Sequence, residues 1–211
     1  MASKKSARVR DKILSCAEVL FAKEGFKGTS VRVIAEAAQC NQAMIHYYFG
    51  NKNNLYLEVF RSRWMPKELS VIQKFKDSIA QLENPTPAQL IEAYVRAYVD
   101  RSLTDAEKHT QRLLIVREIA APGEAFKLVS EQINKPTTKI FMQHMRNHLA
   151  EGTNDEKLTL SILAIYGMVY YFTYSQNMVV SVTERAFNQT FKEELIRTIV
   201  EFSLQGMPLK K

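Results

Sequence analysis

The side chains that could do acid–base or metal chemistry are few and scattered along the chain. The four histidines are His46, His109, His144 and His148, and no serine, histidine and aspartate set of a hydrolase accompanies them. His144 and His148 are four residues apart, so on a helix they would share one face and form half of a metal site. Glu151 could complete that site only if the helix continued so far. No glycine-rich phosphate loop is present. We therefore expect no catalytic residue, no metal and no cofactor.

A second group of side chains, within residues 30–52, is of the kind that contacts nucleic acid. Gln42 can pair with adenine through two hydrogen bonds, and Ala43 can contact the methyl group of thymine. Residues that could lie at the rim, beside phosphate oxygens, follow along the chain: His46, Tyr47, Tyr48 and Lys52. This chemistry is recognition by hydrogen bonds and apolar contact.

The elements that must position these residues are two short helices joined by a three-residue turn. Apolar spacing predicts one helix over residues 30–38 and another over 42–49, with 39–41 as the turn. The first helix must cross the second closely, and Ala35 and Ala38 are small enough to allow this. Polar residues that can cap the two helices precede them: Thr29 or Ser30, and Asn41.

The charge distribution favours a polyanionic partner for this part of the chain. The 211 residues carry a net charge of +7, and residues 1–64 hold eleven lysines and arginines against five acidic residues. The remaining residues are almost neutral. Such asymmetry is typical of a segment that meets nucleic acid, although a merely solvated basic face would look the same.

The rest of the chain predicts more helices and no strand, so the fold class is all-α with about nine helices. Leu158 to Thr183 is uncharged but too polar for a lipid span, which indicates a helix buried in protein. Cys16 and Cys40 have no metal-binding spacing; we expect reduced, half-buried thiols, with redox sensing as the alternative. The further helices are expected over about 9–25 and 53–64, from Pro87 through Tyr98, and over about 104–120, 124–149 with a bend at Pro136, 157–182 and 186–204.

Two runs, Thr29 to Ala38 and Asn41 to Lys52, resemble the DNA-binding domain of the TetR/AcrR family. The resemblance covers about residues 8–64. It implies a homodimeric transcriptional regulator with a helix-turn-helix domain over 1–66 (motif about 30–49) and a ligand-binding and dimerisation domain over 67–211. Most such proteins repress transcription and release operator DNA when a small molecule binds. Arg117-Glu118-Ile119, with Pro122 and Phe126 beyond, resembles the CecR-like branch of the family.

The resemblance also assigns DNA contacts to residues of the motif. Arg32, Gln42, Ala43 and Tyr47 would face bases or sugars, and the phosphate backbone would be held by Ser30, Asn41, His46, Tyr48 and Lys52. Two positions depart from the family pattern. Gln39 stands where a turn glycine is usual, so a positive φ there would cost about 1 kcal/mol. His46 replaces a tyrosine, which makes its phosphate contact shorter and sensitive to pH. Tyr48 could instead be a core residue.

Dimerisation is expected through the two C-terminal helices, with burial inside one subunit as the alternative. The expected interface residues are Ile162, Ile165, Val169, Phe172, Phe191, Leu195, Ile199 and Phe202. The dimer would set its recognition helices roughly 34–36 Å apart. A hydrophobic or cationic effector is expected among the middle helices, unless the candidate lining residues are plain core. These candidates are Trp64, Leu114, Glu118, Phe126, Met142, Met145, Tyr166 and Tyr170.

Other classes of function compete with this interpretation. An architectural DNA-binding protein without an effector would not need so large and so nearly neutral a C-terminal region. A protein-interaction module would leave the basic first third without a role. We therefore expect a cytoplasmic regulator, on the nucleoid when bound, with operator DNA, a small molecule and a second copy of the chain as its partners.

Overall fold

The computed structural model describes residues 2–101 and 103–210, with side chains from residue 6 onward. Within these ranges all regular elements are helical, as predicted, and extended backbone pairs only at a bridge between Leu149 and Leu209. The chain divides into two compact units, residues 1–68 with 103–131 and residues 69–102 with 132–211. The expected boundary at residue 66 lies near the end of the first range. Residues 103–131, however, were expected in the C-terminal domain and instead pack with the N-terminal helices.

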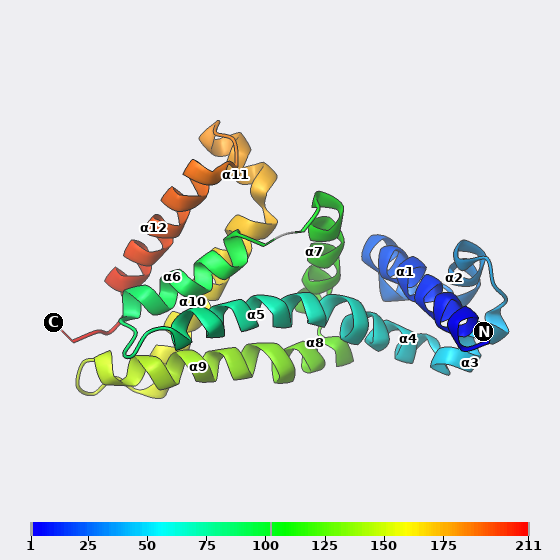
Figure 1. The fold of residues 1–211 in the computed structure, drawn as a ribbon, viewed down its shortest axis with the longest axis horizontal. Coiled ribbons are helices and arrows are strands. Elements are labelled where there is room, and N and C mark those ends of the chain that lie inside the picture. Colours follow the sequence, from blue (N-terminus) through cyan, green and yellow to red (C-terminus); the bar gives the residue numbers. More distant parts are fainter. Residues whose placement is uncertain (1, 102, 211) are drawn as a thin grey trace. The chain divides into compact units, whose positions relative to one another are not determined.

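The first unit is built around one long N-terminal helix that contacts four others (Figure 1). Its elements are α1 (Ala2–Gly28), α2 (Val31–Ala38), α3 (Gln42–Phe49), α4 (Lys52–Val59), the π-helical turn η1 (Phe60–Trp64), α7 (Asp105–Ala120) and α8 (Glu124–Val129). The expected start of α1 near Val9 is wrong, because the helix begins at Ala2. Gly25 interrupts α1 with φ 76°, which is the left-handed break predicted there.

The helix does not end at Pro66, where the sequence predicted an end or a kink. The π-helical turn η1 leads directly into α5 (Met65–Ala80), which the sequence analysis did not predict. Prolines and π-helical turns are both common causes of irregularity in long helices, and here they are neighbours in a helix that continues past them. Val71, Phe75 and Ile79 follow at helical spacing and are buried, and this spacing was the available signal for α5.

The second unit has its own apolar core, formed by residues of α5, α6, α9, α10 and α12. Its elements are α6 (Pro87–Val99), α9 (Lys135–Met145) after the π-helical turn η2 (Ser130–Asn134), the 3-10 turn η3 (Arg146–His148), α10 (Asp155–Tyr174), α11 (Gln176–Thr183) and α12 (Gln189–Gly206). The phenyl rings of Phe75 and Phe141 stack at 5.3 Å, and Tyr94 packs on both.

The single helix expected over residues 157–182 is broken in the structure. Ser175 leaves the helical conformation at φ −109° and ψ 33°, and α10 and α11 meet there at an angle of 79°. Across the described ranges, no single helix is long and apolar enough to cross a membrane; only this bent pair reaches the required length and composition.

Candidate nucleic-acid interface

The helix-turn-helix is shaped by caps and by one left-handed residue. Ser30 accepts a hydrogen bond from the backbone N of Val33 at 3.2 Å and caps α2, and Asn41 accepts one from Met44 N at 2.9 Å and caps α3. Gln39 between them adopts φ 54° and ψ 46°, so the positive φ predicted at this position is confirmed. This conformation turns the chain sharply enough for α3 to begin three residues after Gln39, at Gln42.

The exposed side of α3 carries the residues that were predicted to read bases. Gln42, Ala43 and Tyr47 are exposed, whereas Ile45 and Phe49 on the other side are buried. Tyr47 keeps 81% of its accessible surface. Its ring packs edge-on against Tyr48, with centroids 5.1 Å apart, and this contact holds Tyr47 at the surface. The exposed side of α3 thus presents the side chains of Gln42 and Ala43 and the projecting ring of Tyr47.

Two residues at the rim of α3 already have partners inside the protein. The hydroxyl of Tyr48, which is half-buried, lies 2.9 Å from Oγ of Ser6. His46 Nδ1 lies 2.9 Å from the carbonyl oxygen of Gly50, so Nδ1 must carry the proton, because a carbonyl can only accept. Nε2 of His46 can therefore donate to a phosphate only when the ring is doubly protonated.

Lys52 was expected to anchor a phosphate, but its ammonium group has partners within the protein. Nζ donates to the carbonyl oxygens of Phe26 at 2.8 Å and Thr29 at 3.0 Å, and lies 4.2 Å from the centre of the Phe26 ring. Lys52 thus joins the start of α4 to the end of α1. At most one of its three N–H groups remains for DNA.

Other basic side chains near the motif are also used within the fold. Arg10 pairs with Glu58 at 2.6 Å, and Lys12 donates to the side-chain oxygen of Gln39 at 2.6 Å. Arg32 is exposed, and its Nε lies 3.7 Å from Glu36 one helical turn away. An exposed pair of this kind contributes little stability, so Arg32 can exchange Glu36 for a phosphate or a base at small cost.

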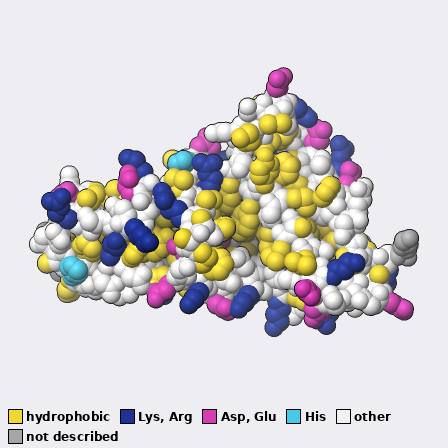
Figure 2. Space-filling view, turned by 180° about the vertical axis from the view of Figure 1, so that it is seen from behind, with side chains coloured by type: hydrophobic (Ala, Val, Ile, Leu, Met, Phe, Trp, Pro, Cys, Tyr) yellow, Lys and Arg dark blue, Asp and Glu magenta, His cyan; other side chains and the backbone are white. Residues whose placement is uncertain are grey.

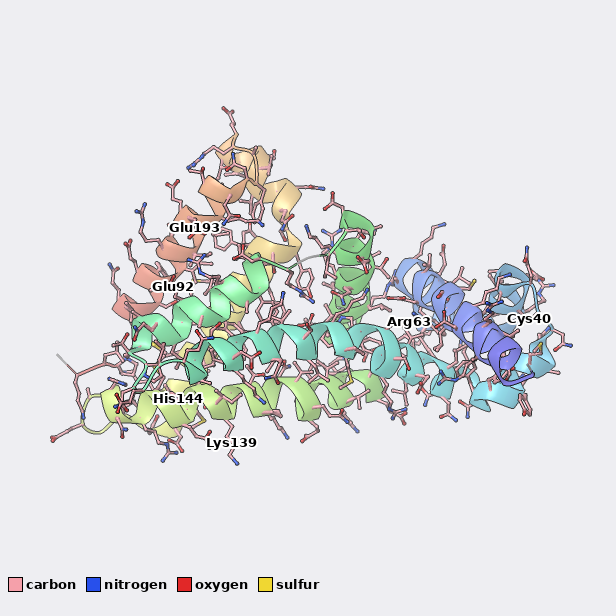
Figure 3. All side chains as sticks on the ribbon, viewed as in Figure 1. Cys40, Arg63, Glu92, Lys139, His144 and Glu193 are labelled. Atoms are coloured by element: carbon pink, nitrogen blue, oxygen red, sulfur yellow. The ribbon has the colours of Figure 1, made fainter. Side chains whose placement is uncertain are left out.

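Arg63 and Arg117 fix the long helix α1 from two sides. Arg63 of η1 donates to the carbonyl and carboxylate oxygens of Asp11, the latter at 2.6 Å (Figure 3). Arg117 of α7 donates to the carbonyl oxygens of Ala22 at 3.1 Å and Lys23 at 2.7 Å. These carbonyls lie just before the break in α1 at Gly25. Neither arginine was predicted from the sequence to have this role.

Glu118, a predicted ligand-pocket residue, joins three elements of the first unit. Its carboxylate accepts hydrogen bonds from the Tyr56 hydroxyl at 2.7 Å and from the backbone N of Phe126 at 2.8 Å and Gly123 at 3.3 Å. Burial raises the pKa of Tyr56, and its bond to Glu118 raises that pKa further, so Tyr56 remains a donor. The buried carboxylate is thereby satisfied without a ligand.

The other predicted pocket residues are distributed between the two units. Trp64 and Leu114 are fully buried in the first unit, and Met145 is fully buried in the second. Tyr166 is also part of the second core, against which Met142 and Tyr170 pack. For these residues the structure supports the plain-core alternative. The described residues contain no group of three or more histidine, cysteine or acidic side chains suited to a metal ion.

The predicted dimer interface requires a correction. Six of its eight residues are buried in the core of the second unit, because they lie on the sides of α10 and α12 that pack against the rest of that unit: Ile162, Ile165, Val169, Phe191, Leu195 and Ile199. Phe172 is partly buried, and Phe202 remains 67% exposed.

An apolar surface does exist on the opposite side of α10. Leu160, Leu163, Gly167 and Tyr171 recur at helical spacing and are exposed, and Leu160 keeps 60% of its accessible surface. Figure 2 shows hydrophobic side chains gathered over this part of the second unit. We call Leu160, Leu163, Gly167 and Tyr171 the α10 stripe. Sequence periodicity could not single it out, since the uncharged helix is apolar on both sides.

Comparison with known families divides the chain into two matches. Residues 13–59 match the family described as bacterial regulatory proteins, tetR family. Residues 87–207 match the C-terminal domain of the HTH-type transcriptional dual regulator CecR. The first match spans the helix-turn-helix, and the second spans most of the remaining chain.

Individual proteins agree with these matches. The HTH-type transcriptional dual regulator CecR of Shigella flexneri is 26% identical over 96% of this chain and 94% of its own length. The HTH-type transcriptional repressor NicS of Pseudomonas putida is 46% identical over 25% of this chain and 24% of its own. A Clostridium perfringens structure described as a putative fatty acid metabolism regulator superposes with a TM-score of 0.63 at 16% identity, covering 94% of this chain and all of that one. The chain therefore belongs to the TetR family of DNA-binding transcriptional regulators, in the group that has the CecR C-terminal domain.

Proposed function

We propose that this regulator is a repressor that binds a palindromic operator as a homodimer and leaves it when a small molecule binds. The exposed side of α3 carries most of the support. Gln42 and Ala43 stand at the start of the helix, where side chains reach base edges in the major groove. Tyr47 projects one turn later and can reach the sugar-phosphate backbone.

The α10 stripe supports the homodimer. An exposed apolar surface on one helix of an otherwise well-packed unit is typical of an interface. Pairing of the stripe with its twofold mate, beside Phe202 of α12, would form an isologous contact. A twofold dimer presents two recognition helices to two half-sites, and this symmetry corresponds to a palindromic operator.

Release by an effector requires only that the effector bind more tightly to a conformation with wrongly spaced recognition helices. We infer that this change passes through α4, because Tyr56 and Lys52 join it to α7 and α1. The effector itself would be hydrophobic or cationic. The protein would act in the cytoplasm, on the nucleoid.

The names of the relatives suggest two modes of regulation, repression alone or dual action. NicS is named a repressor, whereas CecR, which is similar over almost the whole chain, is named a dual regulator. Dual action on different promoters is therefore the second candidate. Operators that overlap the core promoter favour repression, and operators upstream of it favour activation.

Selection of genomic DNA fragments by the full-length protein tests this proposal. We expect enrichment of one palindromic sequence, with affinity that falls steeply as salt concentration rises because phosphate contacts release counterions. Recovery of fragments without a shared palindrome would contradict the proposal. A transcription assay on the recovered promoters, with and without the protein, then gives the sign of regulation.

A further inference from the structure

The only two cysteines of the chain belong to the helix-turn-helix and the helix beneath it. Cys40 lies in the turn between α2 and α3, directly before Asn41, the cap of the recognition helix (Figure 3). Cys16 lies in α1. Both are free thiols and both are partly exposed, so a small reagent can reach them.

Hydrogen bonds hold the turn against the part of α1 that contains Cys16. Lys12 Nζ donates to Gln39 Oε1 at 2.6 Å, which places the turn beside α1. Cys16 follows Lys12 by one helical turn on the same face, and Cys40 is the residue after Gln39. The backbone N of Cys40 donates to the carbonyl oxygen of Ala35 at 2.9 Å and so fixes the backbone from which its side chain projects.

The electrostatics of Cys40 agree with this proximity. Partial burial raises the pKa of the Cys40 thiol, and the neighbouring Cys16 raises it further, while Lys12 lowers it. Mutual repulsion between two thiolates is felt only at short range. Cys16 and Cys40 therefore lie near enough for their charges to interact.

We propose that Cys16 and Cys40 form a dithiol site that a hydroperoxide oxidises to an intramolecular disulfide, and that this disulfide weakens operator binding. The second part rests on the proposed function. One thiolate attacks the peroxide, giving a sulfenic acid and an alcohol or water. The other thiol then displaces water from the sulfenic sulfur. The two thiols lose two electrons and two protons in total, and the peroxide is reduced.

Because Cys40 lies just before the recognition helix α3, the disulfide would change DNA recognition. A disulfide constrains its Cα atoms to a separation of about 4.4–6.8 Å and fixes the Cβ directions. Closing it draws the turn toward α1 and reorients Asn41, and hence the start of α3. Gln42 and Ala43 are the first two residues of that helix. Loss of one bidentate base contact by such a shift lowers affinity about tenfold or more.

Treatment of the reduced full-length protein with hydrogen peroxide tests the proposal. We expect the intact mass to fall by two hydrogen atoms and a digest to yield a peptide pair joined through Cys16 and Cys40. Affinity for the selected palindrome should fall about tenfold and return after reduction with dithiothreitol. Cys16→Ser and Cys40→Ser are matched controls; each should bind DNA when reduced and keep its affinity for the palindrome under the same brief peroxide treatment.

Three results would overturn the proposal: sulfinic acids without a cross-link, a disulfide only between two chains, or the intramolecular cross-link with unchanged affinity. Failure of the reduced protein to bind any palindrome would count against the proposed function. The mass and digest readouts need no DNA, so they would still decide whether the dithiol site exists.

Discussion

Gln39 holds the one strained backbone conformation inside the helix-turn-helix, at φ 54°. A non-glycine residue in this region costs about 1 kcal/mol, since its Cβ approaches the following carbonyl. Gln39→Gly should therefore raise the free energy of unfolding, measured by urea denaturation, by up to about 1 kcal/mol. Gln39→Ala, which removes the bond to Lys12 but keeps the Cβ, is the control and should not stabilise. Equal stabilities of the two variants would contradict this explanation.

Substitution of Lys52 distinguishes a structural role of this side chain from a DNA-binding role. Lys52→Met removes two hydrogen bonds from a charged donor to the carbonyl oxygens of Phe26 and Thr29, so we expect the free energy of unfolding to fall by about 1.5–3 kcal/mol. Lys27→Met, at an exposed position of the same unit, should leave it unchanged. Weaker DNA binding by Lys52→Met at unchanged stability would restore the phosphate anchor predicted from the sequence.

At the scale of elements, the capping box of α7 links stability to pH. The backbone and hydroxyl of Thr104, together with Lys67, lower the pKa of Glu107 from its ordinary 4.5 to about 2. Because the folded pKa lies below the unfolded one, this stabilisation is complete above the unfolded value and is lost as pH falls toward the folded value.

Glu107→Gln keeps the capping geometry but removes the charge. We expect the wild type to be the more stable at neutral pH, with the difference shrinking between about pH 5 and pH 2. Urea denaturation at several pH values measures this, and Glu83→Gln, at an exposed loop position, is the control. A difference that does not change with pH would show that Glu107 acts only through its hydrogen bonds.

Local chemistry decided which elements the sequence could predict. The caps Asn41 and Thr104 and the break at Gly25 depend on neighbours within a few residues, and all three are confirmed. The bend at Ser175 contains no proline or glycine. The polar residues around it were too weak a signal to predict a helix break within a long uncharged segment. The helix start at Ala2 was missed because its first residues are polar and give no apolar periodicity.

At the scale of the whole molecule, the residues that the sequence predicted for a dimer interface lie on the buried side of α10, and the α10 stripe lies on the other side. A helix with apolar residues all round gives no periodic signal for which side packs within the subunit. Ile162 and Leu163 are adjacent, yet one is buried and the other exposed. The bonds from Lys52 to Phe26 and from Tyr56 to Glu118 were equally out of reach, since these residues lie far apart in sequence and only the packing of α1, α4 and α7 brings them together.

The α10 stripe makes a prediction about assembly. Leu163→Asp would place a charge at the centre of the dimer contact, so we expect the mass measured by analytical ultracentrifugation to fall to that of a monomer. Lys76→Glu, on an exposed face of α5, is the control and should remain dimeric. A dimer of unchanged strength in Leu163→Asp would place the interface on another surface.

The central claim is that the exposed side of α3 reads DNA bases, and Gln42→Ala tests it most directly. The measurement is fluorescence anisotropy of the full-length protein with the selected palindrome and with an unrelated duplex of the same length. We predict that affinity for the palindrome falls about 5- to 150-fold, equivalent to about 1–3 kcal/mol for one bidentate base contact, while binding to the unrelated duplex is unchanged. An equal loss on both duplexes, or no loss on either, would contradict base reading by α3.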